Sequence, residues 1–175
     1  DARRDWSAPC GRAIDIQPLD AFAFGTPITM DSGILFLTFA TLRSQRDDAQ
    51  SRLQQLLAWL GEDFDGVIAI DEAHELANAA GTDTQYGTQK GSEQGLAGVR
   101  LQNLLPRACI LYNSATGATD PANLCYTSRL GLWGQGSAFD TREAFMTAIG
   151  SGGIAAMEIV ARDLKALGLY TARAL

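Results

Sequence analysis

The chain has 175 residues, of which 46% are hydrophobic and 19% are charged, and its formal net charge is −6. This length allows one compact domain with a hydrophobic core, and the composition is typical of a soluble globular protein. The negative charge argues against a surface that binds nucleic acid over its whole extent, because phosphate contacts need Lys and Arg.

The apolar runs and the cysteines of the sequence also argue against a membrane or a secreted location. We find no apolar run that approaches the ~20 residues of a bilayer span. The three cysteines, Cys10, Cys109 and Cys125, are far apart and odd in number. They are typical of reduced thiols in an intracellular protein, and not of a disulfide framework or a zinc site.

The first half of the chain predicts strands and one amphipathic helix. A short strand is expected at 13–19, closed by Pro18, and a stronger one at 33–42, which is rich in β-branched and aromatic residues. Leucines at helical spacing predict a helix over 47–60 that stops at Gly61. The continuous apolar run at 65–70 predicts a strand buried on both faces.

The second half of the chain continues the alternation of predicted strands and helices. The polar, glycine-rich stretch 78–92 predicts a mobile loop, and Ser92 is placed to cap a helix through Leu105. A second buried strand is expected at 107–113. After it, Asp120 and Pro121 are suited to begin another helix.

The tail from about 141 to 168 predicts two helices split at the glycine-rich "GSGG". Its apolar stripe is expected to pack in the core, and it consists of Ile154, Met157, Val160, Leu164 and Leu167. Strands separated by helices predict an α/β fold with a three-layer, mainly parallel sheet and helices on both faces.

Two polar motifs follow the two buried strands directly. Asp71 follows the first strand and Ser114 follows the second. Ligands of open parallel sheets bind beyond the carboxyl ends of the strands, so we expect both motifs at the same edge of the sheet.

The first motif reads Asp71-Glu72-Ala73-His74. An acid at a strand end can hold magnesium, and a second acid beside it can orient the water that attacks a γ-phosphate. His74 would then bond to Ser114 or Thr116. The alternatives are two acids that only cap the next helix, or a metallohydrolase, for which one histidine cannot supply the usual zinc ligands.

These residues resemble a known family. "DEAH" (71–74) and "SAT" (114–116) are similar to motifs II and III of superfamily 2 helicases. The chain is more specifically similar to the helicase-like ATPase domain of the strawberry notch family. That resemblance rests on "RRDWSA" (3–8), "GILFLTFATLRS" (33–44), "SATGATDP" (114–121), "RLGLWG" (129–134) and "AMEIVARDLK" (156–165).

The resemblance implies a RecA-like lobe that binds ATP with magnesium and moves on nucleic acid. Asp71 would hold magnesium, Glu72 would position water, and His74 would act with them. The coupling residues would be Ser114, Ala115 and Thr116. Family members often carry a basic residue where Glu75 stands and a small one where Asn113 stands.

One expected part of such a motor is not found in these 175 residues. A phosphate-binding loop ends in Gly-Lys, but Lys90 follows Gln89 and Lys165 follows Leu164. We therefore expect a single partial RecA-like domain over 1–175, without its P-loop segment and second lobe, inactive alone. An exposed sheet edge would then allow self-association.

Two function classes remain open. The first is a nucleic-acid-dependent ATPase lobe, for which Arg43, Lys90 and Arg129 are weaker candidates for phosphate contacts. The second is a catalytically inert interaction or regulatory module that keeps the RecA-like fold. Neither class implies a membrane partner.

Overall fold

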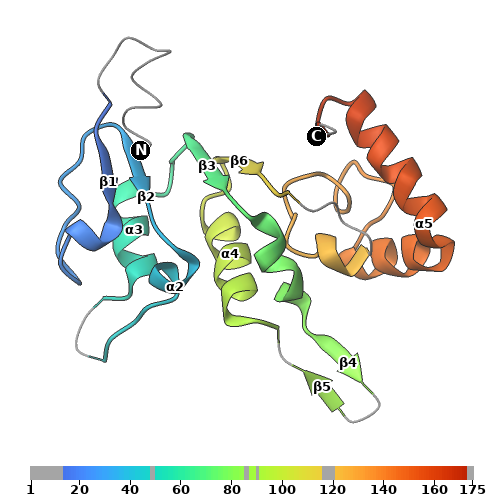
Figure 1. Ribbon diagram of the computed structural model, residues 1–175, viewed down its shortest axis with the longest axis horizontal. Coiled ribbons are helices and arrows are strands. Elements are labelled where there is room, and N and C mark those ends of the chain that lie inside the picture. The colour runs from blue at the N-terminus through green and yellow to red at the C-terminus, as the bar shows by residue number, and fades with distance from the viewer. Residues whose placement is uncertain (1–13, 48–49, 85–86, 90, 116–120, 173–175) are drawn as a thin grey trace. The chain divides into compact units, whose positions relative to one another are not determined.

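The computed structural model describes residues 14–47, 50–84, 87–89, 91–115 and 121–172. The chain divides into two compact units, Asp1–Phe64 and Asp65–Leu175. Both are built from short strands and helices (Figure 1), which confirms the predicted α/β class. A single partial domain over 1–175 stays a prediction, and the proposed helix start at Asp120 lies outside the described residues.

The first unit contains a parallel pair of strands and two helices. Strand β1 (Ile16–Pro18) pairs with β2 (Ile34–Phe36), with Ile16 opposite Ile34. The connection between them begins with the short 3-10 helix η1 (Leu19–Ala21). Leu19, Ile28 and Met30 form the core of this unit, and Phe22, Leu35, Leu37 and Trp59 pack against them.

The predicted strand over 33–42 is wrong in its second half. The strand ends at Phe36, and Phe39–Leu42 forms the one-turn helix α2. The side chain of Thr38 accepts a hydrogen bond from the backbone N–H of Thr41. A threonine cap of this kind satisfies a helix-start donor, and this local bond outweighs the strand preference of the aromatic and β-branched residues.

The second helix of the unit, α3 (Arg52–Leu60), begins five residues later than the predicted helix. Ser51 and Gln54 form a capping box, in which each side chain bonds the backbone N–H of the other residue. This reciprocal pair fixes the helix start at Ser51. The helix ends before Gly61, as predicted, where a φ of 78° suits glycine.

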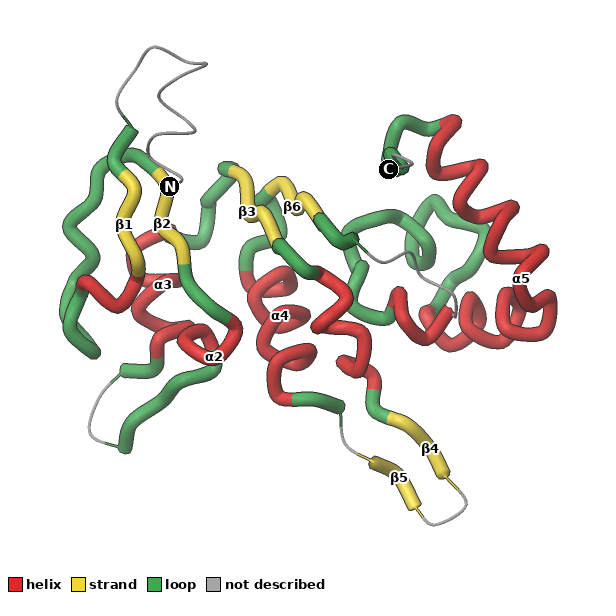
Figure 2. Tube along the Cα trace, in the orientation of Figure 1, coloured by secondary structure: helices red, strands yellow, loops and turns green. Residues whose placement is uncertain are grey.

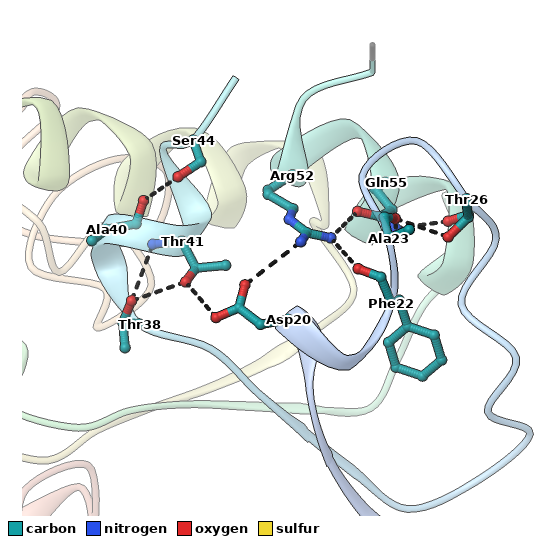
Figure 3. Close-up of polar contacts among 10 residues, drawn as sticks. All are labelled: Asp20, Phe22, Ala23, Thr26, Thr38, Ala40, Thr41, Ser44, Arg52 and Gln55. Atoms are coloured by element: carbon teal, nitrogen blue, oxygen red, sulfur yellow. Dashed lines mark hydrogen bonds and ion pairs between the residues drawn. The ribbon is translucent and has the colours of Figure 1, made fainter. Parts of the chain in front are cut away.

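A buried polar network ties the loop after η1 to α3 (Figure 3). The Arg52 guanidinium donates to the carbonyl of Phe22 at 2.8 Å and to Gln55 Oε1 at 2.7 Å, and lies 3.6 Å from Asp20. Gln55 in turn donates to the carbonyls of Ala23 and Thr26 at 2.9 and 2.7 Å. The loop is thus held by side chains rather than by a strand ladder.

The second unit is organised around another parallel pair. Strand β3 (Val67–Ile70) pairs with β6 (Cys109–Tyr112), with Ile70 opposite Tyr112. Both strands lie where the sequence predicts them, and they run side by side in Figure 2. Among the described residues the strands form three two-stranded sheets. Self-association through an open strand edge stays a prediction.

Burial on both faces of β3 was predicted and is wrong. Val67 and Leu111, which point to one face of the pair, are 68% and 57% exposed, whereas Ile70 is buried. Side chains alternate between the faces of a strand, so one face of the pair packs on the core and the other is open in this chain. An unbroken apolar run in the sequence does not distinguish these two cases.

The stretch after β3 is more ordered than the predicted loop. It forms the 3-10 helix η2 (Ala73–Ala80) and an antiparallel hairpin of β4 (Thr82–Thr84) and β5 (Gly87–Gln89). Three threonines in the two strands favour extended backbone and offset the turn preference of the glycines.

Helix α4 (Glu93–Leu104) begins at the predicted cap, because Ser92 accepts from the backbone N–H of Gly95. It packs closely on η2 through two glycines. A Cβ at Gly95 would lie 2.6 Å from Ala79 Cα, and one at Gly98 would lie 2.7 Å from Leu76 Cδ1. The fully buried Leu76 therefore depends on the lack of a side chain at Gly98, and Ala79 depends on the lack of one at Gly95.

The tail forms the 3-10 helix η3 (Pro121–Leu124) and the long helix α5 (Arg142–Ala166). Gly153 has non-helical angles, φ 58° and ψ −144°, and divides α5 into two arms, visible in Figure 1. This break at "GSGG" confirms the predicted split. Phe145 in the first arm is buried and contacts the rings of Trp133 and Phe139.

The second arm of α5 does not form core, contrary to the prediction. Ile154 and Leu167 are 76% and 71% exposed, and Met157, Val160 and Leu164 are only partly buried. By length and composition alone, α5 is also long and apolar enough to cross a membrane, which corrects the expectation that no run approaches that length. Core helices of soluble proteins meet the same criterion of length and composition.

Candidate functional site

The carboxyl ends of β3 and β6 meet at one edge of the second unit. The backbone N–H of Asn113 donates to the carbonyl of Ile70 at 2.9 Å, and that of Ala73 donates to the carbonyl of Asn113 at 2.8 Å. The residues after both strands are therefore bonded to each other. The predicted shared edge for Asp71 and Ser114 is confirmed.

Asp71 lies exposed at this edge, directly after β3. Asn113 Nδ2 donates a hydrogen bond of 2.8 Å to its Oδ1. This bond connects the two strand ends through side chains, in addition to the two backbone bonds. In the sequence alone, Asn113 stands out only as a departure from the pattern of the family that the chain resembles. The sequence feature that indicates the role of Asn113 is its side-chain amide, a hydrogen-bond donor placed one residue after the strand that pairs with β3.

Glu72 has a left-handed backbone conformation with φ 49°, the only positive φ at a described residue other than glycine. Such a conformation is uncommon for a residue with a side chain, and here it belongs to the turn that Ala73 closes on Asn113. Its carboxylate Oε2 lies 3.2 Å from His74 Nδ1. Glu72 is thus turned toward the histidine.

His74 connects the two motifs. Its Nδ1 lies 3.1 Å from Ser114 Oγ, which confirms the predicted contact across the edge. Its Nε2 lies 3.7 Å from Glu75 Oε1. The imidazole therefore has an acidic neighbour on each nitrogen, Glu72 on Nδ1 and Glu75 on Nε2.

Of the remaining predicted site residues, the structure describes Arg43, Ala115 and Arg129. Thr116 and Lys90 lie outside the described residues, and Ala115 directly follows Ser114. Arg43 is an exposed residue at the end of α2 in the first unit.

Arg129 has a local role in the second unit. Its guanidinium donates to the carbonyls of Gln102, Leu105, Pro106 and Ala108, where α4 ends and leads into β6. The last carbonyls of a helix lack partners within the helix, and an arginine supplies them here. Its role in nucleic-acid binding stays a prediction.

Gln102, which the sequence analysis missed, organises the inner face of this unit. It is fully buried and donates to the carbonyls of Gly98 and Tyr126, at 3.1 and 3.0 Å. Its Oε1 accepts from Tyr112 Oη and from Ser128 Oγ. Burial raises the pKa of Tyr112 to about 12 and also raises that of Tyr126. Both phenols therefore stay uncharged at neutral pH, and Tyr112 acts as a donor to Gln102.

The side chains of this edge include carboxylate oxygens, the ligand type that magnesium takes in proteins. Within the described ranges, no three His, Cys, Asp or Glu side chains come together as metal ligands. Magnesium differs from zinc in that it keeps several waters and takes one or two carboxylates together with substrate phosphates. Asp71, an exposed aspartate that accepts a hydrogen bond from the Asn113 amide, fits that requirement.

Comparison with known proteins identifies the family of the chain. The family model described as "P-loop containing NTP hydrolase pore-1" matches residues 1–175. The chain is 40% identical to chicken protein strawberry notch homolog 1, 42% identical to mouse protein strawberry notch homolog 2, and 40% identical to Drosophila protein strawberry notch. Each match covers 100% of this chain.

The chain spans 14%, 12% and 11%, respectively, of the lengths of these relatives. No solved structure matches it. Because the family model and the relatives cover the chain from end to end, this protein belongs to the strawberry notch family, as part of its helicase-like P-loop NTPase domain.

Proposed function

We propose that this chain carries the magnesium- and water-positioning part of an ATP-dependent helicase or translocase motor that acts on nucleic acid. The observation that supports the proposal is the shared edge: the acids after β3 and the serine after β6 lie together, with His74 Nδ1 at 3.1 Å from Ser114 Oγ. Ligands bind at this end of parallel sheets.

Asp71 is the proposed magnesium ligand. It is exposed, and the hydrogen bond from Asn113 uses one of its two carboxylate oxygens. A carboxylate has acceptor sites for about four bonds, so one amide donor leaves room for a cation or its waters. When bound with ATP, magnesium would neutralise charge on the β- and γ-phosphates.

Glu72 is the proposed residue that orients the attacking water. Its carboxylate lies 3.2 Å from His74 Nδ1, and its side chain is 55% exposed. An ionised glutamate only accepts hydrogen bonds, so it would turn one water O–H toward itself and the lone pair of the water away from itself. The proton would move to the Glu72 carboxylate as the water attacks.

His74 is the proposed link between this chemistry and movement. It contacts Glu72 on its own segment and Ser114 on the segment after β6. A shift of Ser114, Ala115 and Thr116 on nucleic-acid binding would therefore reach Glu72 through one imidazole. Such coupling requires that His74 makes different contacts in the two states of the motor.

The proposal includes parts that other sequence must supply. The 175 residues contain no Gly-Lys pair, so the phosphate-binding loop and the second lobe would come from outside this stretch. Nucleic-acid contacts by Arg43, Lys90 and Arg129 and an intracellular location belong to the same proposal.

The test uses two proteins. The chain alone, assayed for phosphate release from magnesium-ATP, should show no turnover above an Asp71→Ala control. In a protein that joins this chain to a Gly-Lys phosphate loop and a second lobe, Glu72→Gln should lower kcat by roughly 100-fold or more, since it removes a general base. Glu62→Gln, an exposed charge change in the first unit, should leave kcat unchanged. Equal turnover by Glu72→Gln and Glu62→Gln would reject the proposed mechanism.

A catalytically inert interaction module is the second candidate. The observation that favours it is the exposed apolar surface on the β3–β6 pair and on the second arm of α5, with Val67, Leu111, Ile154 and Leu167 all more than half exposed. The coding sequence upstream of Asp1 separates the two candidates. A Gly-Lys phosphate loop there supports the motor, and its absence supports the module.

A further inference from the structure

The residue after β6 has a double connection to the residue after β3. The backbone of Asn113 bonds to Ile70 and Ala73, on either side of the acidic turn, and its side-chain amide bonds to Asp71 Oδ1 at 2.8 Å. A carboxylate can only accept, so the amide must present its N–H₂ group to Asp71. The direction of this bond is therefore fixed by chemistry.

We infer that Asn113 is a positioning residue for magnesium: its amide holds Oδ1 of Asp71 so that Oδ2 is presented to the cation. This inference rests on the proposed role of Asp71 and adds a residue that acts through it. An exposed aspartate otherwise rotates about two side-chain torsions, and ordering it costs free energy when the metal binds. Here the backbone bonds of Asn113 to the neighbours of Asp71 hold the donor itself in place.

The neutral amide is suited to this task. A lysine or arginine at position 113 would pair with the Asp71 charge and compete with the cation for it. Serine or alanine is too short to make the same bond from this backbone position. Asparagine orders the carboxylate and leaves its full negative charge for the metal. Outer-shell partners of metal-binding carboxylates have this same function in metalloproteins.

The experiment uses the full 175-residue chain and Mn²⁺ alone as the probe, because this ion replaces magnesium and broadens nearby NMR signals. In the unsubstituted chain, Mn²⁺ should broaden the Asn113 side-chain amide signals together with the backbone amides of Asp71 and Glu72. The side-chain amide of Asn103, an exposed residue on α4, should stay sharp at the same concentration. A sharp Asn113 amide beside a broadened Asp71 would overturn the inference, and this result does not depend on any variant.

Variants then separate the inference from the proposed function. Asn113→Ser should raise the half-saturating Mn²⁺ concentration about tenfold, the lower end of the usual outer-shell effect, with an unchanged circular dichroism spectrum. Asn103→Ser, the same replacement on α4, should not shift it. Mn²⁺ binding that is lost in Asp71→Ala but unchanged in Asn113→Ser overturns the role of Asn113 alone. Binding that persists in Asp71→Ala overturns the magnesium role of Asp71 and this inference with it.

Discussion

His74 Nδ1 lies 3.1 Å from Ser114 Oγ, although 40 positions separate the two residues along the chain. The contact exists because β3 and β6 are parallel neighbours in a register that places Ile70 opposite Tyr112. It joins the acidic turn to the segment after β6 without passing through the backbone ladder. It is the contact through which a motor of the proposed kind would transmit a change of state.

The first prediction concerns this contact. In the joined protein described above, Ser114→Ala should reduce the stimulation of ATP turnover by nucleic acid roughly tenfold, because it removes a contact worth about 1–2 kcal/mol. Turnover without nucleic acid should change less than twofold. Ser32→Ala, an exposed serine of the first unit, is the matched control. Unchanged stimulation in Ser114→Ala would remove the coupling role from His74 and Ser114.

The second prediction concerns the close approach of α4 and η2. Gly95→Ala places a methyl group 2.6 Å from Ala79 Cα, a backbone atom that cannot move independently. We expect a net loss of about 1–3 kcal/mol in the free energy of unfolding, despite the better helix propensity of alanine. Gly150→Ala, where a Cβ meets nothing within 4 Å, should instead raise stability by about 0.5–1 kcal/mol. Urea denaturation of both variants provides the measurement, and equal shifts would contradict the packing of α4 on η2.

The third prediction concerns pH. The pKa of Tyr112 is raised by burial from 10.0 to about 12, so between these values the folded state binds more protons than the unfolded state. The contribution of Tyr112 to stability is thus fully present below pH 10 and is lost as pH rises through about 12. Tyr112→Phe should flatten this decline and cost about 1 kcal/mol at neutral pH through the lost bond to Gln102. Thermal melts of the unsubstituted chain and of Tyr112→Phe at a series of pH values from 8 upward would test it. An equally steep decline of stability with rising pH in the two proteins would contradict it.

The fourth prediction concerns the buried network of the first unit, shown in Figure 3. Gln55→Leu removes both donors to the loop carbonyls and the acceptor for Arg52, which is only 5% exposed. We expect a loss of roughly 2–3 kcal/mol, because a buried cation loses a partner. Gln50→Leu, an exposed glutamine before the helix, should change stability by less than about 0.5 kcal/mol. A small, equal effect of both substitutions would show that the network does not hold the loop.

Several elements follow from local sequence alone. The strands β3 and β6 are continuous apolar runs, α4 has a serine cap, and the glycines at "GSGG" break α5, and each of these signals lies within one segment. The acidic turn was also found in this way, because Asp71 follows an apolar run directly. The family resemblance came from motifs read along the chain.

Local bonds decided the elements that the sequence analysis got wrong. The cap at Thr38 turned half of a predicted strand into α2, and the predicted loop after η2 formed a hairpin. In both stretches, the conformational preferences of neighbouring residues are of similar size and favour different secondary structures. Which conformation each stretch adopts depends on the hydrogen bonds that form, and the helix or strand propensity of its residues does not show these bonds.

The sequence by itself determined the α/β class, the family and the acidic motif, because these depend on residue order and periodicity. Only the tertiary structure decided that the amide of Asn113 meets Asp71, that Arg129 caps α4, and that Ile154 and Leu167 of the α5 stripe are exposed. The physical reason is that such contacts join residues far apart in the chain, and the register of paired strands and the packing of helices bring those residues together.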